Sequence, residues 1–303
     1  MVFYVIGLGL GDEKDITVRG LEVVKKCKRV YLEYYTSVLG IDNAKLSAFY
    51  GVPVVLADRN MVESEAEQMY EGAGEEDVAF LVVGDALCAT THTDLMLRVK
   101  ALGIPVEVIH NTSVMGAAAS CGLQLYQFGY TVSIPLFEGE WRPDSFYDRI
   151  KYNQGGGMHT LCLLDIKVKE PDYDAMCAGK IKFLPPRFMT VNCAVRQLLE
   201  VEEKKREGVV TEDSLAVGLA RLGQPTQKMV FGTLKQLLSV DFGAPLHSLA
   251  LCGETHPLEM DVLEQYRVKE EDMTNTGTAK PEGEGGTDGD GDEEPDLLSN
   301  TIY

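Results

Sequence analysis

A glycine-rich turn directly after the first apolar run of the chain is the first candidate for chemistry. Glycines alternate in Gly7-Leu-Gly-Leu-Gly11, and an acidic residue, Glu33, ends the next apolar run. This order is typical of dinucleotide-binding turns. The spacing argues against one, because the third glycine would fall on Asp12 or Lys14, and an aspartate at a helix start repels phosphate. Two interpretations remain: a turn that a ligand approaches closely, or a tight turn that needs glycine dihedrals.

A carboxylate at the end of the most apolar run is the second candidate. Asp85 follows Gly84 there, and ligands of parallel sheets collect at the carboxyl ends of strands. The alternative is that Asp85 is the N-cap of a helix in the segment that follows, and we favour ligand binding. His92 and Asp94 follow closely and could be metal ligands, but neither has a partner at helical spacing. We expect no metal site, and the polar stretch Thr90–Asp94 to cap a helix.

Later polar residues and absent motifs narrow the chemistry further. The stretch His110-Asn-Thr-Ser113 could cap a helix or bind a ligand, and His247, at the start of a late apolar run, is more often structural. The chain has no GxSxG, SxxK, HExxH or P-loop motif. We name no catalytic residue, and expect a reaction that depends on orientation and desolvation.

The elements that position these residues form two α/β domains. Residues 1–111 alternate short apolar runs with helical patterns, which predicts a mostly parallel sheet. Strands are expected at Val2–Gly7, Arg29–Leu32, Val52–Leu56, Val78–Val83 and Val106–Ile109, and helices after Asp15 and at Val62–Glu71 and Thr93–Leu102. In residues 112–267 we expect strands at Thr131–Leu136, Thr160–Ile166, Ser214–Arg221 and Leu246–Leu251, and helices at Ser113–Leu125, Asp144–Lys151, Thr190–Glu207 and Phe231–Ser239.

Charge and composition set the remaining limits. The 303 residues carry a formal net charge of −19, with eleven acidic residues and two lysines from Val268 onward. We expect residues 268–303 to be a disordered acidic tail. No basic stripe is present for nucleic acid, and no apolar run approaches the roughly 20 residues of a membrane helix. Seven cysteines without a CxxC pair, and no basic leader before the first apolar run, favour a reduced cytoplasmic protein.

Short stretches spread in order over residues 2 to about 267 carry a resemblance to one known family. They are Gly7-Leu-Gly-Leu-Gly11-Asp12, Asp15-Ile-Thr17, Tyr31-Leu-Glu33, Tyr35-Thr-Ser37, Phe80-Leu-Val-Val-Gly84-Asp85, Ala89-Thr-Thr-His92, Val108-Ile-His-Asn111, Gly122-Leu-Gln-Leu-Tyr126, Trp141-Arg-Pro143, Met158-His-Thr-Leu-Cys-Leu-Leu-Asp165, Gly218-Leu-Ala-Arg221 and Pro245-Leu-His247. The chain resembles the diphthine synthases, in particular their eukaryotic branch.

The resemblance implies a fold and an activity. The fold would be the two-domain tetrapyrrole methylase-like fold, with S-adenosylmethionine in the cleft between the domains, usually in a homodimer. The eukaryotic branch methylates the modified histidine of translation elongation factor 2. Methyl groups go to the amine and the carboxylate of a 3-amino-3-carboxypropyl group, which gives diphthine methyl ester in diphthamide biosynthesis.

The resemblance also implies cofactor contacts, residue by residue. By matching motif positions they fall on Leu10, Asp85, Cys88, Ser113, Val114, Leu164, Leu222 and His247. Cys88 departs from the family, which has glycine in this turn. Its side chain could narrow the pocket, and a turn that needed a positive φ would be strained.

Other functions are weighed against this one. A related methylase of a small tetrapyrrole ring would share the fold, but the match along the whole chain argues against it. A nicotinamide-dependent dehydrogenase would use the early glycines and Glu33, but the third glycine is missing. A non-catalytic scaffold remains if Cys88 closes the pocket.

Overall fold

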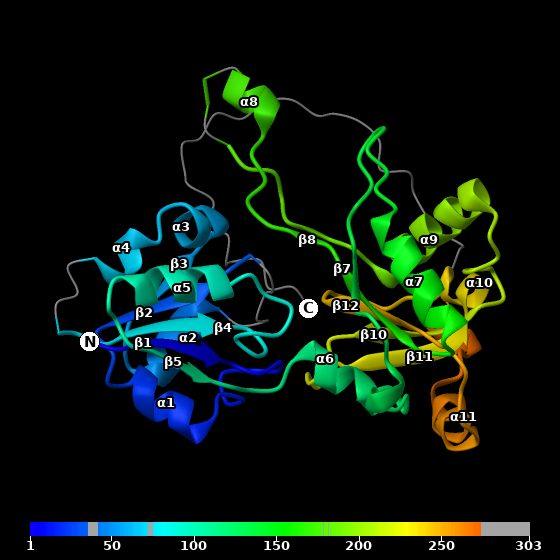
Figure 1. The fold of residues 1–303 in the computed structure, drawn as a ribbon, viewed down its shortest axis with the longest axis horizontal. Helices are drawn as coiled ribbons and strands as arrows, with labels where there is room; N and C mark the ends of the chain where they lie inside the picture. The colour runs from blue at the N-terminus through cyan, green and yellow to red at the C-terminus, as the bar shows by residue number, and fades with distance from the viewer. Residues whose placement is uncertain (36–41, 72–74, 178, 181, 274–303) are drawn as a thin grey trace.

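The structure is a computed structural model that describes residues 1–35, 42–71, 75–177, 179–180 and 182–273. Two five-stranded sheets lie side by side, each with its own helices (Figure 1). One sheet is built from residues 3–109 and the other from residues 132–251. Thr36 and Ser37 of the matched stretches lie outside the described residues. Within the described part, no helix is long and apolar enough to cross a membrane.

The N-terminal sheet is entirely parallel, as the alternating pattern predicts, and its order is β3-β2-β4-β1-β5. Its strands are β1 (Phe3–Gly7), β2 (Arg29–Glu33), β3 (Val54–Ala57), β4 (Val78–Val82) and β5 (Val106–Ile109). Every residue of β4 is buried, because helices cover both faces of the sheet. Its helices are α1 (Val18–Val24), α2 (Asn43–Tyr50), α3 (Arg59–Glu63), α4 (Glu67–Tyr70) and α5 (Thr93–Ala101).

The helices divide between the two faces by their apolar side chains. Val62 of α3, Met69 of α4 and Leu95 of α5 pack in one core cluster. Val24 of α1 and Leu46 of α2 pack in another. The carboxyl ends of the parallel strands are left open, and they face the second domain (Figure 1).

The C-terminal sheet has the order β11-β10-β12-β7-β6 and is antiparallel except for the β6–β7 pair. Its strands are β6 (Val132–Ile134), β7 (Thr160–Leu164), β10 (Leu215–Ala220), β11 (Lys228–Thr233) and β12 (His247–Leu251). Its helices are α6 (Val114–Ala117), α7 (Ser145–Gly155), α9 (Val191–Lys205), α10 (Leu234–Leu237) and α11 (Pro257–Leu263). An arm of β8 (Ile166–Lys167), α8 (Tyr173–Cys177) and β9 (Arg187–Phe188) rises from the end of β7 (Figure 1).

Several predicted elements begin or end elsewhere. Thr17 caps α1, not Asp15, whose carboxylate accepts from the backbone N–H of Gly11. The acidic helix expected at 62–71 is two short helices, α3 and α4. The helix expected at 113–125 is one α-helical turn followed by 3₁₀ turns.

The helix predicted from Phe231 is wrong at its start. Phe231 belongs to β11 and pairs with Val217 of β10. The helix begins only after Thr233, which forms a capping box with Gln236. The apolar residues before Thr233 are buried against the sheet, and this burial overrides their helical spacing.

Ordered structure continues past Arg267, where we expected the tail to begin. The backbone N–H of Val268 donates to the carbonyl of Phe231 at 2.8 Å, and that of Asp241 donates to Asp272 at 2.8 Å. Lys228 and Asp272 also form an ion pair at 2.9 Å. The segment 268–273 therefore belongs to the second domain, and residues 274–303 of the expected tail lie outside the described residues.

Candidate functional site

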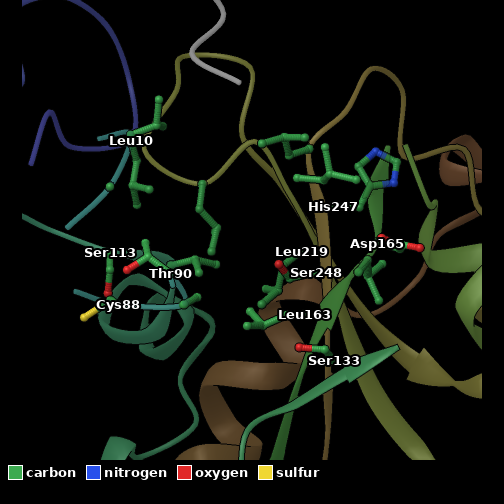
Figure 2. Close-up of a pocket in the computed structure, with 18 of the residues that line it drawn as sticks. Leu10, Cys88, Thr90, Ser113, Ser133, Leu163, Asp165, Leu219, His247 and Ser248 are labelled. Atoms are coloured by element: carbon green, nitrogen blue, oxygen red, sulfur yellow. The ribbon is translucent and has the colours of Figure 1, made fainter. Parts of the chain in front are cut away.

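A cavity of about 460 Å³ opens between the two domains, at the carboxyl ends of the parallel strands. Its N-terminal wall follows β1, β2, β3, β4 and β5, and its C-terminal wall comes from the β6, β7, β10 and β12 region. Figure 2 shows Leu10, Cys88 and Ser113 on one side of this space and His247 and Asp165 on the other. The size is in the range of cavities that bind cofactors or substrates.

Seven of the eight residues predicted to bind a cofactor line this cavity. They are Leu10, Cys88, Ser113, Val114, Leu164, Leu222 and His247. These positions are up to 237 residues apart in the chain, and the strand ends bring them together. That they bind a cofactor stays a prediction.

Asp85, the eighth predicted residue, is not among the residues that line the cavity. Its buried carboxylate accepts from the backbone N–H of Leu87 at 2.9 Å and of Asn111 at 2.9 Å, and it pairs with Nδ1 of His110 at 2.9 Å. Burial raises the pKa of this carboxyl, but the two backbone N–H groups and His110 outweigh it, and the pKa is lowered. Asp85 thus ties the loop after β4 to the loop after β5. It is not a helix N-cap, since the next helix, α5, begins only at Thr93, and a contact of Asp85 with a cofactor stays a prediction.

The turn that carries Cys88 is strained at the next residue. Ala89 has φ 62°, in the left-handed region, whereas Cys88 is not among the residues with positive φ. The Cys88 side chain is half-buried at the cavity wall. The glycine of the family is therefore not needed at position 88 for a left-handed backbone, and the cavity stays open with cysteine there.

The early glycines are packed against protein atoms. A Cβ on Gly7 would lie 2.6 Å from the carbonyl oxygen of Gly84, and one on Gly9 would lie 2.7 Å from Cβ of Asp15. A Cβ on Gly11 would lie 2.8 Å from the carbonyl oxygen of Gly223 in the second domain. The glycines allow close backbone packing, including the approach of the two domains, as the tight-turn interpretation expects. That a ligand approaches them directly stays a prediction.

His247 presents an unsatisfied nitrogen in the buried wall. Its Nε2 lies 3.0 Å from the carbonyl oxygen of Ala244, and its Nδ1 has no hydrogen-bond partner among the described residues. Burial lowers the pKa of this imidazole, and the nearby charge of Arg221 lowers it further. A neutral imidazole that donates through Nε2 offers Nδ1 as an acceptor to a ligand.

Arg221 fixes the loop that carries His247. Its Nη1 donates to the carbonyls of Phe242, at 2.8 Å, and Ala244, and its Nε donates to the carbonyl of Thr226 at 3.0 Å. These bonds occupy N–H groups of the guanidinium, so Arg221 at the cavity wall is hydrogen-bonded mainly to the protein's own backbone.

His92 does not cap the helix as predicted. It lies at the N-cap of α5, but its side chain makes no capping bond. The ring is buried between Phe80 and Tyr35, at centroid distances of 5.0 Å and 6.2 Å, and neither nitrogen has a partner among the described residues. Burial lowers the pKa of His92 to about 4. The ring is therefore neutral and packs as an aromatic side chain.

Several polar residues that line the cavity were not singled out from the sequence as site residues. Five of them are Tyr35, Arg59, Ser133, Asp165 and Ser248. Arg59 and Ser133 lie outside the matched stretches, and only their positions at strand ends could have indicated them. Within the described ranges, no group of three or more His, Cys, Asp or Glu side chains could hold a metal ion.

Comparison with known proteins gives the family. The tetrapyrrole (corrin/porphyrin) methylases match residues 2–238. The diphthine methyl ester synthase of Dictyostelium discoideum is 55% identical over 271 residues, which cover 89% of this chain and 99% of the relative. That of Homo sapiens is 54% identical over 274 residues, covering 89% and 96%. The crystal structure of a candidate diphthine synthase from Entamoeba histolytica is 49% identical, with TM-score 0.79 over 88% of this chain and 99% of that one.

A two-domain α/β fold with an open cavity at its strand ends, together with the family match, defines an S-adenosylmethionine-dependent methyltransferase of the tetrapyrrole methylase fold. Within that class, the chain belongs to the diphthine methyl ester synthase family. The sequence resemblance and the two-domain fold are thereby confirmed.

Proposed function

We propose that this protein binds S-adenosylmethionine in the cavity between its domains and methylates the 3-amino-3-carboxypropyl-modified histidine of translation elongation factor 2. Methyl groups are transferred to the amine, and one methyl group is transferred to the carboxylate. The product is diphthine methyl ester, an intermediate of diphthamide biosynthesis. The single observation that carries the proposal is that seven cofactor positions, matched one by one from the family, line one cavity of suitable size.

The cavity walls suit the groups of this cofactor. Leu10, Val114, Leu164 and Leu222 offer an apolar lining for a nucleoside. The buried and unpartnered Nδ1 of His247 needs a hydrogen-bond donor, which an amino or hydroxyl group of the ligand can supply. When bound, the cofactor supplies an electrophilic methyl group on a sulfonium.

The protein's own contribution is binding, orientation and exclusion of water. The two domains wall the cavity from two sides, and water that a bound acceptor displaces there would favour the neutral amine that can attack. We assign no general base. A pH profile of single-turnover methylation tests this, and a rate that collapsed on replacing one histidine, with cofactor affinity intact, would contradict it.

A thermal shift tests the cofactor first. S-adenosylhomocysteine at 100 times its dissociation constant stabilises the folded protein by about 2.7 kcal/mol, which raises Tm by several degrees. NADH serves as the control and should give no shift. A shift with NADH alone would overturn the proposal in favour of a dehydrogenase, and a porphyrin-type ring methylated in place of elongation factor 2 would favour the tetrapyrrole alternative.

We further propose that the protein works as a homodimer in the cytoplasm, as the family resemblance implies. The seven cysteines, all free in the structure, support a reducing compartment. One chain has a mass of 33.3 kDa, and light scattering of the purified protein should give twice that mass. A single-chain mass at micromolar concentration would contradict the dimer.

A further inference from the structure

One end of the cavity lies apart from the seven predicted cofactor residues. In the N-terminal sheet those residues follow β1, β4 and β5, which form one side of the order β3-β2-β4-β1-β5. Tyr35 and Arg59 also line the cavity, but they follow β2 and β3 at the other edge. The wall beyond β2 and β3 is therefore free for the second reactant.

Arg59 supplies a cation at this end. Its guanidinium lies over the ring of Tyr35, 5.2 Å from the centroid, which holds the side chain against the cavity wall. Its only ion pair within the described ranges is with Glu63, at 3.9 Å, and the side chain is 65% exposed. At that distance the pair leaves the N–H groups of Arg59 open to an anion.

Asp165 supplies the only carboxylate in the described lining of the cavity. It follows β7 in the opposite domain, and its Oδ2 accepts from the backbone N–H of Leu136 at 2.9 Å. The other oxygen makes no hydrogen bond within the described ranges. The second cation of the lining, Arg221, is engaged by backbone carbonyls. The walls thus present one open cation and one open anion, from different domains.

A bridge between the domains holds the start of the helix that carries Arg59. Asp58 caps α3 by accepting from the backbone N–H of Met61 at 2.9 Å. Its Oδ2 also accepts from Nζ of Lys169, in the arm of the second domain, at 3.2 Å. The domain that carries Asp165 is thereby tied to the segment that carries Arg59.

We propose that Arg59 and Asp165 form the acceptor subsite, which binds a zwitterionic amino-acid end group. Arg59 binds the carboxylate and Asp165 the ammonium group, which releases a proton to water before the neutral amine attacks the methyl group. The proposal rests on the proposed function, in which the acceptor carries both groups on one carbon. The cofactor has a similar end group, and Asp165 directly follows the predicted cofactor residue Leu164. The assignment of the pair to the acceptor therefore rests on the position of Arg59 beyond β2 and β3. Because methylation of the carboxylate removes its charge, the esterified product loses its partner at Arg59.

The test measures acceptor affinity without turnover. Full-length protein saturated with S-adenosylhomocysteine is titrated with elongation factor 2 that carries the 3-amino-3-carboxypropyl group, and separately with the methyl-esterified product. The wild type should bind the carboxylate form about tenfold or more tightly, as expected for a charge-assisted hydrogen bond. Arg59→Gln should lose this preference, and Arg59→Lys should retain part of it.

Matched variants complete the design. Asp165→Asn keeps an oxygen for Leu136 and should weaken binding of both acceptor forms by about tenfold. Arg19→Gln, an exposed arginine on α1, is the control and should bind like the wild type. Melting curves verify that every variant is folded.

Three outcomes would overturn the subsite. In the first, Arg59→Gln retains the wild-type preference for the carboxylate form of the acceptor. In the second, Arg59→Gln or Asp165→Asn loses S-adenosylhomocysteine affinity as strongly as acceptor affinity, which would assign the pair to the cofactor. A wild type that binds S-adenosylhomocysteine but neither form of elongation factor 2 would overturn the proposed function and the subsite together.

Discussion

The Nε2 atom of His247 lies 3.0 Å from the carbonyl oxygen of Ala244, three residues earlier in the chain, at the cavity wall that His247 lines. A carbonyl can only accept, so Nε2 carries the hydrogen and Nδ1 is left as a buried acceptor. The fixed loop therefore chooses the tautomer, and the tautomer decides which ligand groups the wall can bind.

His247→Phe should weaken S-adenosylhomocysteine binding by about tenfold, because it removes one buried acceptor but keeps an aromatic ring. Isothermal titration calorimetry measures the change. His256, which is outside the cavity lining, provides the control substitution to Asn. An unchanged affinity in His247→Phe would contradict a ligand bond at Nδ1.

A ligand hydrogen bond at Nδ1 of His247 also predicts how the affinity for S-adenosylhomocysteine depends on pH. Burial lowers the pKa of His247 below its usual value of 6.5, so the ring is neutral at pH 7. Affinity attributable to Nδ1 should be constant from pH 7 to 8 and be lost only on acidification through the lowered pKa, when Nδ1 becomes a donor. A loss of affinity between pH 8 and 7 would contradict this assignment.

Asp85→Ala should reduce the free energy of unfolding by about 2 kcal/mol or more, because the backbone N–H groups of Leu87 and Asn111 lose their acceptor. Urea unfolding measures it, with Asp261→Ala on an exposed position of α11 as the control. A fully stable Asp85→Ala protein with abolished S-adenosylhomocysteine binding would show that Asp85 contacts the cofactor after all.

Ala89→Gly should stabilise the protein by about 1 kcal/mol, because Ala89 has φ 62° and glycine adopts that region without a Cβ penalty. Ala48→Gly, on an exposed position within α2, is the matched control and should cost about 1 kcal/mol. Chemical denaturation compares the two. If Cys88→Gly stabilised the protein and Ala89→Gly did not, the backbone strain would lie at Cys88, which would contradict its assignment to Ala89.

His92 should make stability fall with acid. Its pKa is about 4 in the folded protein and about 6.5 in the unfolded chain, so the unfolded state binds more protons between these values. Stability should be full above pH 6.5 and fall by about 3 kcal/mol as the pH drops from 6.5 to 4. Compared with His92→Leu by urea unfolding at pH 5 and 7, the wild type should lose more stability, and parallel losses would contradict the assignment.

Local pattern was sufficient where strands are buried on both faces. The run Val78–Val82 is apolar throughout, and its parallel neighbours followed from the helices between them. Pattern failed where a tertiary contact decides. Met229 to Phe231 could continue a helix in sequence, and only pairing with β10 makes them a strand.

The candidate site likewise has residues that the sequence indicated and residues whose position depends on tertiary contacts. Family motifs located seven cavity residues, because these belong to matched stretches or their close neighbours. They did not decide the role of Asp85, because a carboxylate at a strand end can bind a ligand or a neighbouring loop. The structure shows its bond to the loop of Asn111, and a contact with the cofactor stays a prediction. Arg59 lies outside the matched stretches, and beyond its position at a strand end only the packing of two domains around one cavity shows that it lines the site.

Methyl transfer to elongation factor 2 tests the central claim most directly. The purified protein is incubated with methyl-labelled S-adenosylmethionine and elongation factor 2 that carries the 3-amino-3-carboxypropyl histidine, with unmodified elongation factor 2 as the control. We expect label on the modified factor only, part of it released by mild alkali as expected for a carboxyl methyl ester. No label on the modified factor, from protein that binds S-adenosylhomocysteine, would contradict it.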